Sequence, residues 1–185
     1  MIIGITGTDG AGKGTVVEYL VSHHGFTHYS SRDFIMEEIT RLQLPTDRNQ
    51  LRLTANDLRE QFGDDVIVRK AFEKSALEKK SNVVIESIRA LAEVGYLKQN
   101  GGVLLAVDAD PAVRFGRVQG RRSDTDKVTY EEFLAHEALE NNDPNPHGMQ
   151  KARVMALADY TIKNSTNKKA LAHEVEKFIQ TLTQK

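Results

Sequence analysis

The 185-residue chain contains no cysteine, which excludes disulfide bonds and thiolate metal sites. It also has no excess of charge, because 25 Lys and Arg residues stand against 26 Asp and Glu residues. A net charge of −1 does not hold a protein on nucleic acid or on an anionic membrane, so any basic site has to be local. We therefore expect no stable nucleic-acid binding. The absence of cysteine agrees with a reducing compartment, the cytoplasm by default.

Long hydrophobic runs are absent as well. The longest purely aliphatic stretch, Val103 to Val107, is far shorter than the roughly 20 residues that a membrane helix requires. The apolar start MIIGITG has no basic leader and is interrupted by glycine, which argues against a secretory signal. Nothing in the composition separates two halves. We expect residues 1–185 to form one soluble domain with no membrane contact, as a monomer or a homodimer.

Short aliphatic runs recur along the chain, at MIIGIT, NVVIES, GVLLAVDAD and ADYTIKN. They are too short for helices and lack the alternation of half-exposed strands, so they indicate parallel strands that are covered on both faces. Amphipathic helical patterns lie between them. This alternation predicts a doubly wound α/β fold with a five-stranded parallel sheet and helices on both faces. Ligands of such sheets bind beyond the carboxyl ends of the strands.

Two regions interrupt this alternation. Residues 31–80 are helical in pattern and rich in charge, so we expect a helical insertion that forms one wall of a cleft. Residues 120–150 contain Thr129 and Glu132, spaced as a capping box, and then the proline-containing stretch ENNDPNPHGM. We expect this second region to be a short lid, because such segments often close over substrate.

The stretch GTDGAGKGT directly follows the first predicted strand and precedes a predicted helix. Gly7, Gly12 and Lys13 fit the phosphate-binding pattern G-x-x-x-x-G-K-[ST], but Gly14 stands where that pattern has the hydroxyl that sits on magnesium. In this context successive backbone N–H groups and a helix N-terminus surround phosphate oxygens. The predicted phosphate-binding residues are Gly7, Asp9, Gly10, Ala11, Gly12, Lys13, Gly14 and Thr15.

This loop resembles that of the adenylate kinase group of P-loop kinases, G-x-x-G-x-G-K-G-T, which also has glycine after the lysine. The resemblance implies a P-loop NTPase fold that binds ATP, with Thr15 on the α-phosphate and Mg²⁺ held through water by acidic side chains. Asp9 departs from that group, where proline is usual, and is similar to the loop acid of thymidylate kinases, which lies toward the phosphoryl acceptor. A turn-forming aspartate is the alternative.

The segment NVVIESIRALAEV places Glu86 at the end of a predicted strand and Arg89 three residues later. A carboxylate beside the glycine loop can accept hydrogen bonds from magnesium-bound waters, because magnesium keeps several waters. The alternative is a strand-end glutamate in solvent. Arg89 resembles the arginine that holds the acceptor phosphate in nucleotide kinases, and its guanidinium suits a bidentate grip.

The segment FTHYSSRDFIMEEI resembles the segment after the second strand of adenylate kinases. That segment starts with Ser/Thr-Gly-Asp and has an arginine for the acceptor phosphate three residues after the Asp. Asp33 matches that pattern and is a second candidate to hold Mg²⁺ through water. Arg32 replaces the glycine and Met36 replaces the arginine, so Arg32 is a candidate for the acceptor phosphate. Capping of a helix by Ser30 or Ser31 is the equally weighted alternative.

The segment VRFGRVQGRRSD holds four arginines, at 114, 117, 121 and 122, spaced to bring at least three to one helix face. R-x-x-G-R-R matches the helix that enters the lid of adenylate kinases. The match implies that Arg117 lies by the ATP base and that Arg121 lies by the phosphates, where it neutralises charge on the transferred group. His136 and Glu137 stand where related chains would offer another lid arginine.

The segment LADYTIKNSTN resembles the terminal strand and loop of dephospho-CoA kinases, which implies that Asn164, Ser165 and Thr166 lie against adenine. Over nearly its whole length the chain is similar to an uncharacterised archaeal group related to dephospho-CoA kinases and nucleotide kinases.

Several further charged residues carry weaker signals. The histidines at 23, 24 and 28 are interpreted as surface residues, because they lack the pattern of a metal site. Among the arginines of residues 45–63, Arg52 is expected to line a cleft, whereas Arg48 and Arg59 are interpreted as solvated.

The predicted function is an ATP- and Mg²⁺-dependent phosphotransferase that moves the γ-phosphoryl group to a small phosphorylated acceptor, with a nucleoside or deoxynucleoside monophosphate favoured. The proposed catalytic residues are Lys13, Arg89, Arg121, Asp9, Arg32 and Asp33. No general base is needed if the acceptor oxygen is already ionised. Two alternatives remain. One is a dephospho-CoA kinase, in which Asp9 or Asp33 would act as the base, and the other is a nucleotide-dependent switch or assembly ATPase.

Overall fold

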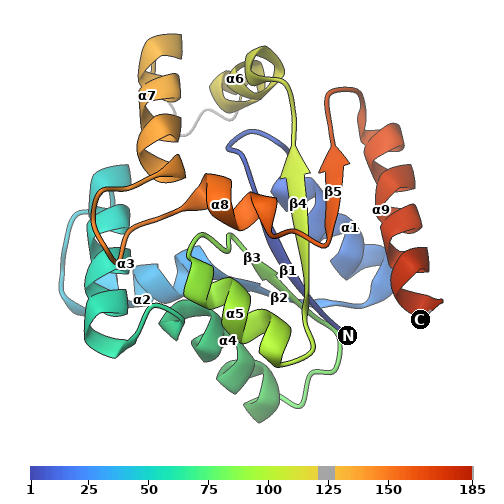
Figure 1. The fold of residues 1–185 in the computed structure, drawn as a ribbon, viewed down its shortest axis with the longest axis horizontal. Coiled ribbons are helices and arrows are strands. Elements are labelled where there is room, and N and C mark those ends of the chain that lie inside the picture. The colour runs from blue at the N-terminus through green and yellow to red at the C-terminus, as the bar shows by residue number, and fades with distance from the viewer. Residues whose placement is uncertain (121–127, 185) are drawn as a thin grey trace.

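Five short apolar segments pair side by side as parallel strands in the computed structural model, which describes residues 1–120 and 128–184. The strands are β1 (Ile2–Gly7), β2 (Thr27–Ser30), β3 (Val83–Glu86), β4 (Val103–Asp108) and β5 (Tyr160–Lys163). Their order across the sheet is β2-β3-β1-β4-β5, and all four pairings are parallel (Figure 1). The predicted five-stranded parallel sheet is confirmed.

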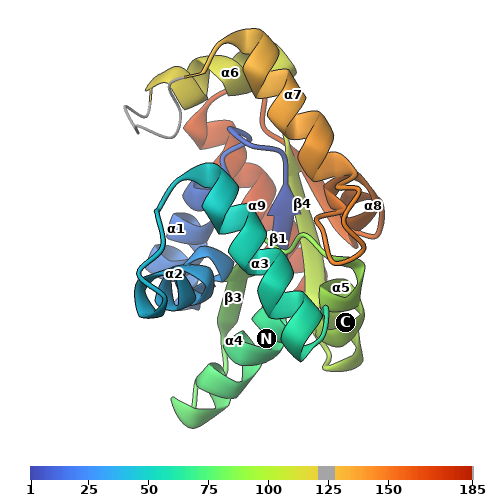
Figure 2. The same cartoon turned by 90° about the vertical axis from the view of Figure 1, so that its left-hand side faces the viewer.

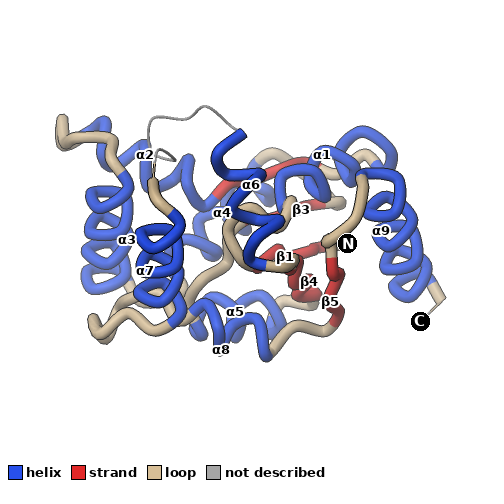
Figure 3. The backbone as a smooth tube through the Cα atoms, turned by 90° about the horizontal axis from the view of Figure 1, so that it is seen from above, coloured by secondary structure: helices blue, strands red, loops and turns tan. Residues whose placement is uncertain are grey.

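Helices cover both faces of this sheet, and Figure 3 shows the strands between them. The helices α1 (Lys13–His24) and α9 (Lys168–Thr183) pack on one face, and α4 (Val66–Leu77), α5 (Leu91–Gln99) and α8 (Lys151–Ala156) belong to the core of the other. Alternate strand residues point to opposite faces. Thus Val84 and Leu105 enter the first core, while Val83 and Leu104 enter the second, and all four are at most 1% exposed. This double burial explains the continuous aliphatic runs of the sequence.

The charged region after β2 folds as three helices. These are α2 (Ser31–Arg41), α3 (Arg48–Phe62) and α4, and α3 begins at Asp47, whose side chain accepts a hydrogen bond from the Gln50 backbone N–H at 3.0 Å. The helix ends at Gly63, where φ is 100°. In Figure 1, α2 and α3 lie together on the left-hand side of the molecule, where they contact each other, and α2 begins directly after β2.

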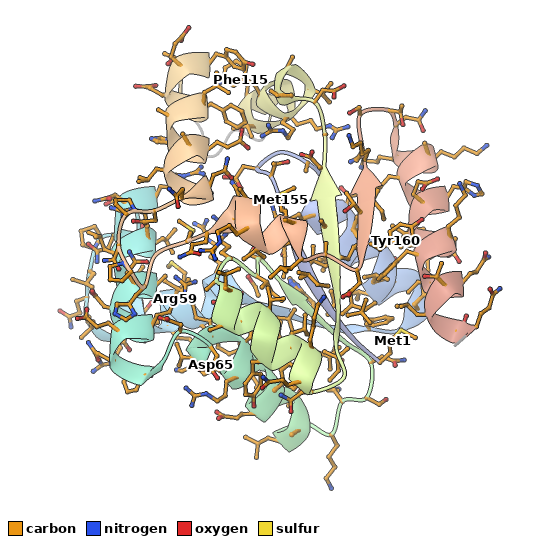
Figure 4. The ribbon with its side chains drawn as sticks, in the orientation of Figure 1. Met1, Arg59, Asp65, Phe115, Met155 and Tyr160 are labelled. Carbon is orange, nitrogen blue, oxygen red and sulfur yellow. The ribbon has the colours of Figure 1, made fainter. Side chains whose placement is uncertain are left out.

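The chain after β4 forms α6 (Pro111–Gly120) and α7 (Tyr130–Asn141), which lie above the carboxyl ends of the strands (Figures 1 and 2). The predicted capping box is present, because Thr129 and Glu132 exchange hydrogen bonds of 3.2 and 2.7 Å with each other's backbone. Phe115, labelled in Figure 4, lies 5.1 Å from the Tyr130 ring and 5.7 Å from the Phe133 ring between centroids. This aromatic cluster joins α6 to α7.

A buried arginine fastens the same pair of helices to the glycine loop. Arg114 is 3% exposed, forms a two-point ion pair with Glu137 at 2.6 and 3.0 Å, and donates to the Asp9 carbonyl oxygen at 3.3 Å. Arg114 is therefore a buried residue that joins α6, α7 and the glycine loop. The predicted phosphate-binding Arg121 lies outside the described residues. Within the described chain, no helix combines the length and apolar character that crossing a bilayer requires.

Candidate functional site

The glycine loop turns sharply between the end of β1 and the start of α1. Gly7 has a φ of 138°, and a Cβ atom added to it would lie 2.0 Å from the Val107 carbonyl oxygen, so the close approach of loop and β4 requires glycine. At Gly14 an added Cβ atom would meet nothing within 4 Å. A hydroxyl residue could therefore stand at Gly14 without steric conflict.

The loop presents unused hydrogen-bond donors to the space above it. The backbone N–H groups of residues 9, 10, 12, 13 and 14 make no hydrogen bond with a described residue. The Lys13 ammonium donates to the carbonyl oxygens of Gly7 and Thr8 at 3.0 and 2.9 Å, and burial lowers its pKa to about 8. Free amides at a helix N-terminus with a lysine beside them form a binding site for an anion.

The segment that follows β5 packs against the glycine loop. The Arg117 Nη1 atom donates to the Asn164 carbonyl oxygen at 2.8 Å, and its Nη2 atom donates to the Thr166 carbonyl oxygen at 3.4 Å. The Asn164 side chain donates to the Ala11 carbonyl oxygen at 2.8 Å, and the Ser165 Oγ atom accepts from the Asp110 backbone N–H at 3.1 Å. The structure therefore brings together Arg117, residues 164–166 and the glycine loop, which the sequence resemblance had linked through the ATP base.

A cavity of about 590 Å³ opens beside the loop. The glycine loop, α2, α3, the end of β3 and α7 contribute to its walls. Among the described residues that line it, six are basic and three are acidic. The basic ones are Lys13, Arg32, Arg48, Arg52, Arg59 and Arg89, and the acidic ones are Asp9, Glu86 and Glu140. The cavity is thus a local cationic site in a chain of nearly zero net charge.

Glu86 is the acid that lies at the cavity from the end of β3. Burial acts to raise its pKa, but the hydrogen bond from His28 and the charges of Lys13 and Arg89 outweigh burial, so the pKa is lowered. The His28 Nε2 atom lies 3.2 Å from the Glu86 carboxylate. Asp33 is exposed in the first turn of α2 and is not among the residues that line the cavity. Of the two predicted acids, Glu86 is the one placed beside the glycine loop.

Asp9, Arg48, Glu140 and Arg89 form a ring in which carboxylates and guanidinium groups alternate. The Arg48 Nη2 atom donates to both carboxylates, in a close contact to Asp9 and at 2.6 Å to Glu140. The Arg89 Nη1 atom donates to Glu140 at 2.8 Å, and its Nη2 atom lies 3.6 Å from the Asp9 carboxylate. We call these four residues the charge ring. It joins the glycine loop to α3, α7 and the segment after β3.

Each carboxylate of the charge ring also lies close to a lysine. The Lys13 Nζ atom lies 3.7 Å from Asp9, and the Lys151 Nζ atom donates to Glu140 at 3.0 Å. Burial acts to raise the pKa of both acids, but the surrounding cations, with Arg89 foremost, outweigh burial. The pKa of Asp9 therefore lies well below its usual range, and that of Glu140 falls to about 2. Both groups are ionised at neutral pH.

The structure corrects the interpretation of two arginines as solvated. Arg59 is 3% exposed and pairs with Glu93 at 3.0 Å, and Arg48 belongs to the charge ring. Arg52 lines the cavity, as expected, and donates to Asp143 at 3.0 Å. Glu140 and Lys151 carried no signal in the sequence, because their partners lie 11 to 92 positions away and no local spacing links them.

The start of α2 contributes two polar groups that lack described partners. Arg32 is exposed, lines the cavity and forms no ion pair with a described residue. The Ser31 hydroxyl is buried and also has no hydrogen-bond partner among the described residues. Ser30 is the N-cap residue, but its side chain makes no capping hydrogen bond, so the predicted side-chain cap is wrong. His136 lines the cavity, and Glu137 forms an ion pair with Arg114.

A five-stranded parallel sheet in this order, with an anion-binding glycine loop between β1 and α1, defines an α/β protein of the P-loop kinase fold. The family model described as an AAA domain matches residues 3–145. A UPF0200 protein from Hyperthermus butylicus is 32% identical over 185 residues, which cover 99% of this chain and 95% of that relative. The chain therefore belongs to the AAA-domain family of P-loop proteins and, within it, to the UPF0200 proteins.

Several solved structures with the same fold are named as kinases of small molecules. The chain is similar to a shikimate kinase from Bacteroides thetaiotaomicron with a TM-score of 0.64 and 16% identity, covering 100% of this chain and 99% of that one. It is also similar to a shikimate kinase from Acinetobacter baumannii in complex with shikimate, with a TM-score of 0.59, 20% identity, and coverage of 100% and 95%. At these identities the likeness establishes the fold, a P-loop kinase-like domain that implies nucleotide binding, and leaves the substrate open.

Proposed function

We propose that the chain transfers the γ-phosphoryl group of ATP to a small acceptor that itself carries a phosphate, with a nucleoside or deoxynucleoside monophosphate favoured. The observation that carries this proposal is the pair of arginines, Arg48 and Arg89, that lines the cavity next to the loop lysine and is linked to it through Asp9. A guanidinium group matches the geometry of a phosphate, and two of them beside an anion-binding loop suit two phosphate groups that must meet.

The donor side would hold ATP through backbone groups. The free backbone N–H groups of residues 9, 10, 12, 13 and 14 and the Lys13 ammonium suit the β- and γ-phosphates. Thr15, half-buried with no described hydrogen bond from its hydroxyl, remains the candidate for the α-phosphate. Residues 164–166 and Arg117 border the loop where the base would lie. Arg121 remains a proposed phosphate contact.

The residues present fit a magnesium ion that is held through water. Glu86 is an ionised carboxylate at the cavity, and Lys13 and Arg89 are the cations near it. The described residues contain no group of three His, Asp or Glu side chains placed to form an all-protein metal cage, so binding through water and phosphate oxygens is the fitting mode. Bound magnesium would neutralise charge on the transferred group. Asp33 stays a weaker candidate, because it lies away from the cavity lining.

The acceptor phosphate would bind to Arg89 and to Arg32 at the start of α2, which forms no ion pair with a described residue. A phosphate oxygen is already ionised at neutral pH, so the transfer needs no general base. The work of the protein is then to position the two phosphates and to stabilise negative charge. This agrees with a cavity that is rich in arginine.

The alternative of a hydroxyl acceptor, as in dephospho-CoA kinase, has less support. A hydroxyl requires a base, and the four cations around Asp9 keep its pKa well below its usual range, which makes its carboxylate a poor proton acceptor. Asp33, the other candidate base, is exposed and does not line the cavity. A switch or assembly ATPase does not need a second cationic site next to the loop, so the same arginines count against it.

The proposal is tested by the rate of ADP release with ATP, magnesium and one acceptor at a time. The panel contains nucleoside monophosphates, deoxynucleoside monophosphates, dephospho-CoA and shikimate. We expect one of the monophosphates to raise the rate about tenfold or more above ATP hydrolysis without an acceptor. If only dephospho-CoA or shikimate raises it, the acceptor is a hydroxyl and the proposal is wrong. If no acceptor raises the rate, the proposal of a small-molecule kinase is wrong, and the alternative of a nucleotide-dependent switch or assembly ATPase gains support.

Two lysine variants provide the matched control. Lys13→Ala removes the ammonium at the loop and should abolish acceptor-dependent turnover. Lys177→Ala removes an exposed lysine on α9 whose contact is Glu174 at 2.7 Å, and it should leave turnover unchanged. Equal losses in the two variants would show that the loss does not come from the loop.

A further inference from the structure

The charge ring contains an arginine that sequence patterns assigned to solvent. Arg48 is the first residue of α3, its side chain is 33% exposed, and it lines the cavity. Its position in the ring is equivalent to that of Arg89, because each guanidinium lies between the same two carboxylates.

Both arginines keep free donors after forming the ring. Arg48 bonds to its two carboxylates through Nη2 alone, and Arg89 donates through Nη1 to Glu140 and to the Met149 sulfur. The Nε and Nη1 atoms of Arg48 and the Nε and Nη2 atoms of Arg89 make no hydrogen bond with a described residue. None of them is a buried unsatisfied atom. The two guanidinium groups are therefore held at one edge and open at another.

Glu140 differs from the two arginines, because both of its carboxylate oxygens already accept hydrogen bonds from the protein. Its side chain is 7% exposed, its Oε1 atom accepts from Arg48, and its Oε2 atom accepts from Arg89 and Lys151. Lys151 is 1% exposed and reaches this carboxylate from α8. Glu140 borders the cavity but is occupied by these three cations, so it can fix the two arginines relative to each other.

We propose that Arg48 is a second binding residue for the phosphate of the acceptor, and that Glu140, backed by Lys151, is the positioning residue that holds Arg48 beside Arg89. A phosphate monoester would use the free edges of both guanidinium groups, while Asp9 keeps them next to the glycine loop. This inference rests on the proposed function, because it names two further residues of the same acceptor site.

Glu140 also links the acceptor site to the cover of the cavity. It lies in the last turn of α7, and the other end of α7 packs through Tyr130 and Phe133 on Phe115 of α6. A change in the position of α7 would therefore move the carboxylate that aligns the two arginines.

The test compares the KM for the acceptor with the KM for ATP, using the monophosphate that is active in the panel. Arg48→Ala should raise the acceptor KM about 10- to 100-fold, the range for lost hydrogen bonds between charged groups, and leave the ATP KM within about twofold. Glu140→Gln should raise the acceptor KM by a smaller factor, about tenfold, with the ATP KM again unchanged. Arg41→Ala, an exposed arginine paired with Glu38 on α2, is the matched control and should change neither constant.

A second measurement does not depend on turnover. Calorimetric titration of inorganic phosphate into protein saturated with ADP should give weaker binding for Arg48→Ala than for wild type and Arg41→Ala. If wild type binds phosphate in this way but no acceptor supports turnover, the proposed function fails while the anion site stands. If Arg48→Ala binds phosphate as well as wild type does, the site inference fails whatever the turnover shows.

A double substitution controls for the possibility that Glu140→Gln alone fails to fold. Glu140→Gln alone leaves the Lys151 ammonium buried without its counter-ion, so the double variant Glu140→Gln/Lys151→Met removes both charges. We expect the double variant to fold and to keep the raised acceptor KM. A double variant with the wild-type acceptor KM would overturn the positioning role. A lower acceptor KM in Glu140→Gln would also overturn it, because Glu140 would then compete with the acceptor for the arginines.

Discussion

The two sides of the cavity are built in different ways. The donor side is one continuous stretch, residues 7–15, in which the backbone N–H groups of residues 9, 10, 12, 13 and 14 make no hydrogen bond with a described residue and a single lysine stands beside them. The acceptor side gathers charged side chains from the glycine loop, α3, the segment after β3, α7 and α8. Backbone groups can be placed by local conformation, whereas a cluster of side chains exists only once the whole fold has formed.

The largest effect that separates the two sides concerns magnesium. Glu86→Gln keeps the shape of the side chain but removes its charge, and we expect the rate of phosphoryl transfer to fall about 100-fold. Gly14→Ser adds the hydroxyl of the common phosphate-loop pattern at a position with nothing within 4 Å, and it should change the rate by less than about threefold. Both rates are measured by ADP release at saturating ATP and acceptor. A large loss of rate in Gly14→Ser with little change in Glu86→Gln would contradict the proposed role of Glu86 in holding magnesium.

The next effect tests how far the donor side depends on backbone shape. Gly7→Ala forces a Cβ atom to within 2.0 Å of the Val107 carbonyl oxygen at a φ of 138°, and it should lower the free energy of unfolding by about 3 kcal/mol. Gly14→Ala, in open space at the start of α1, should change it by less than about 1 kcal/mol. Denaturant titration of the two variants and wild type measures both values. Equal stability of the two variants would contradict the close packing of the loop against β4.

These glycines show what could be predicted from the sequence. The parallel sheet follows from continuous aliphatic runs, and the loop follows from Gly7, Gly12 and Lys13 at fixed spacing, because both depend on local conformation. Glu86 was proposed from its place at the end of a strand and Arg89 from its resemblance to an arginine of nucleotide kinases, and the structure places both at the cavity. Arg48 was misjudged, since an arginine at the start of an amphipathic helix is usually solvated, and its burial depends on contacts with Asp9 and Glu140 that are 39 and 92 positions distant.

The smallest predicted effect is a pH dependence that belongs to the donor side alone. Burial lowers the pKa of Lys13 from 10.5 to about 8, so in the free protein the ammonium loses its proton as the pH rises past 8. ATP binds the charged form better, so its dissociation constant should be flat below about pH 7 and rise above pH 8, by up to about tenfold per pH unit. Lys13→Arg keeps its charge and should remove this rise. Fluorescence titration with an ATP analogue between pH 6.5 and pH 9.5 measures both proteins. A dissociation constant in wild type that falls across this range would contradict the lowered pKa.

The central claim is that the acceptor is recognised through a phosphate of its own, and a matched pair of acceptors tests it most directly. The rate of ADP release is measured with ATP and magnesium and either a nucleoside monophosphate or the same nucleoside without its phosphate. We expect the monophosphate to raise the rate about tenfold or more and its nucleoside not to raise it. Equal stimulation by the nucleoside, or stimulation by neither member of any pair, would contradict it.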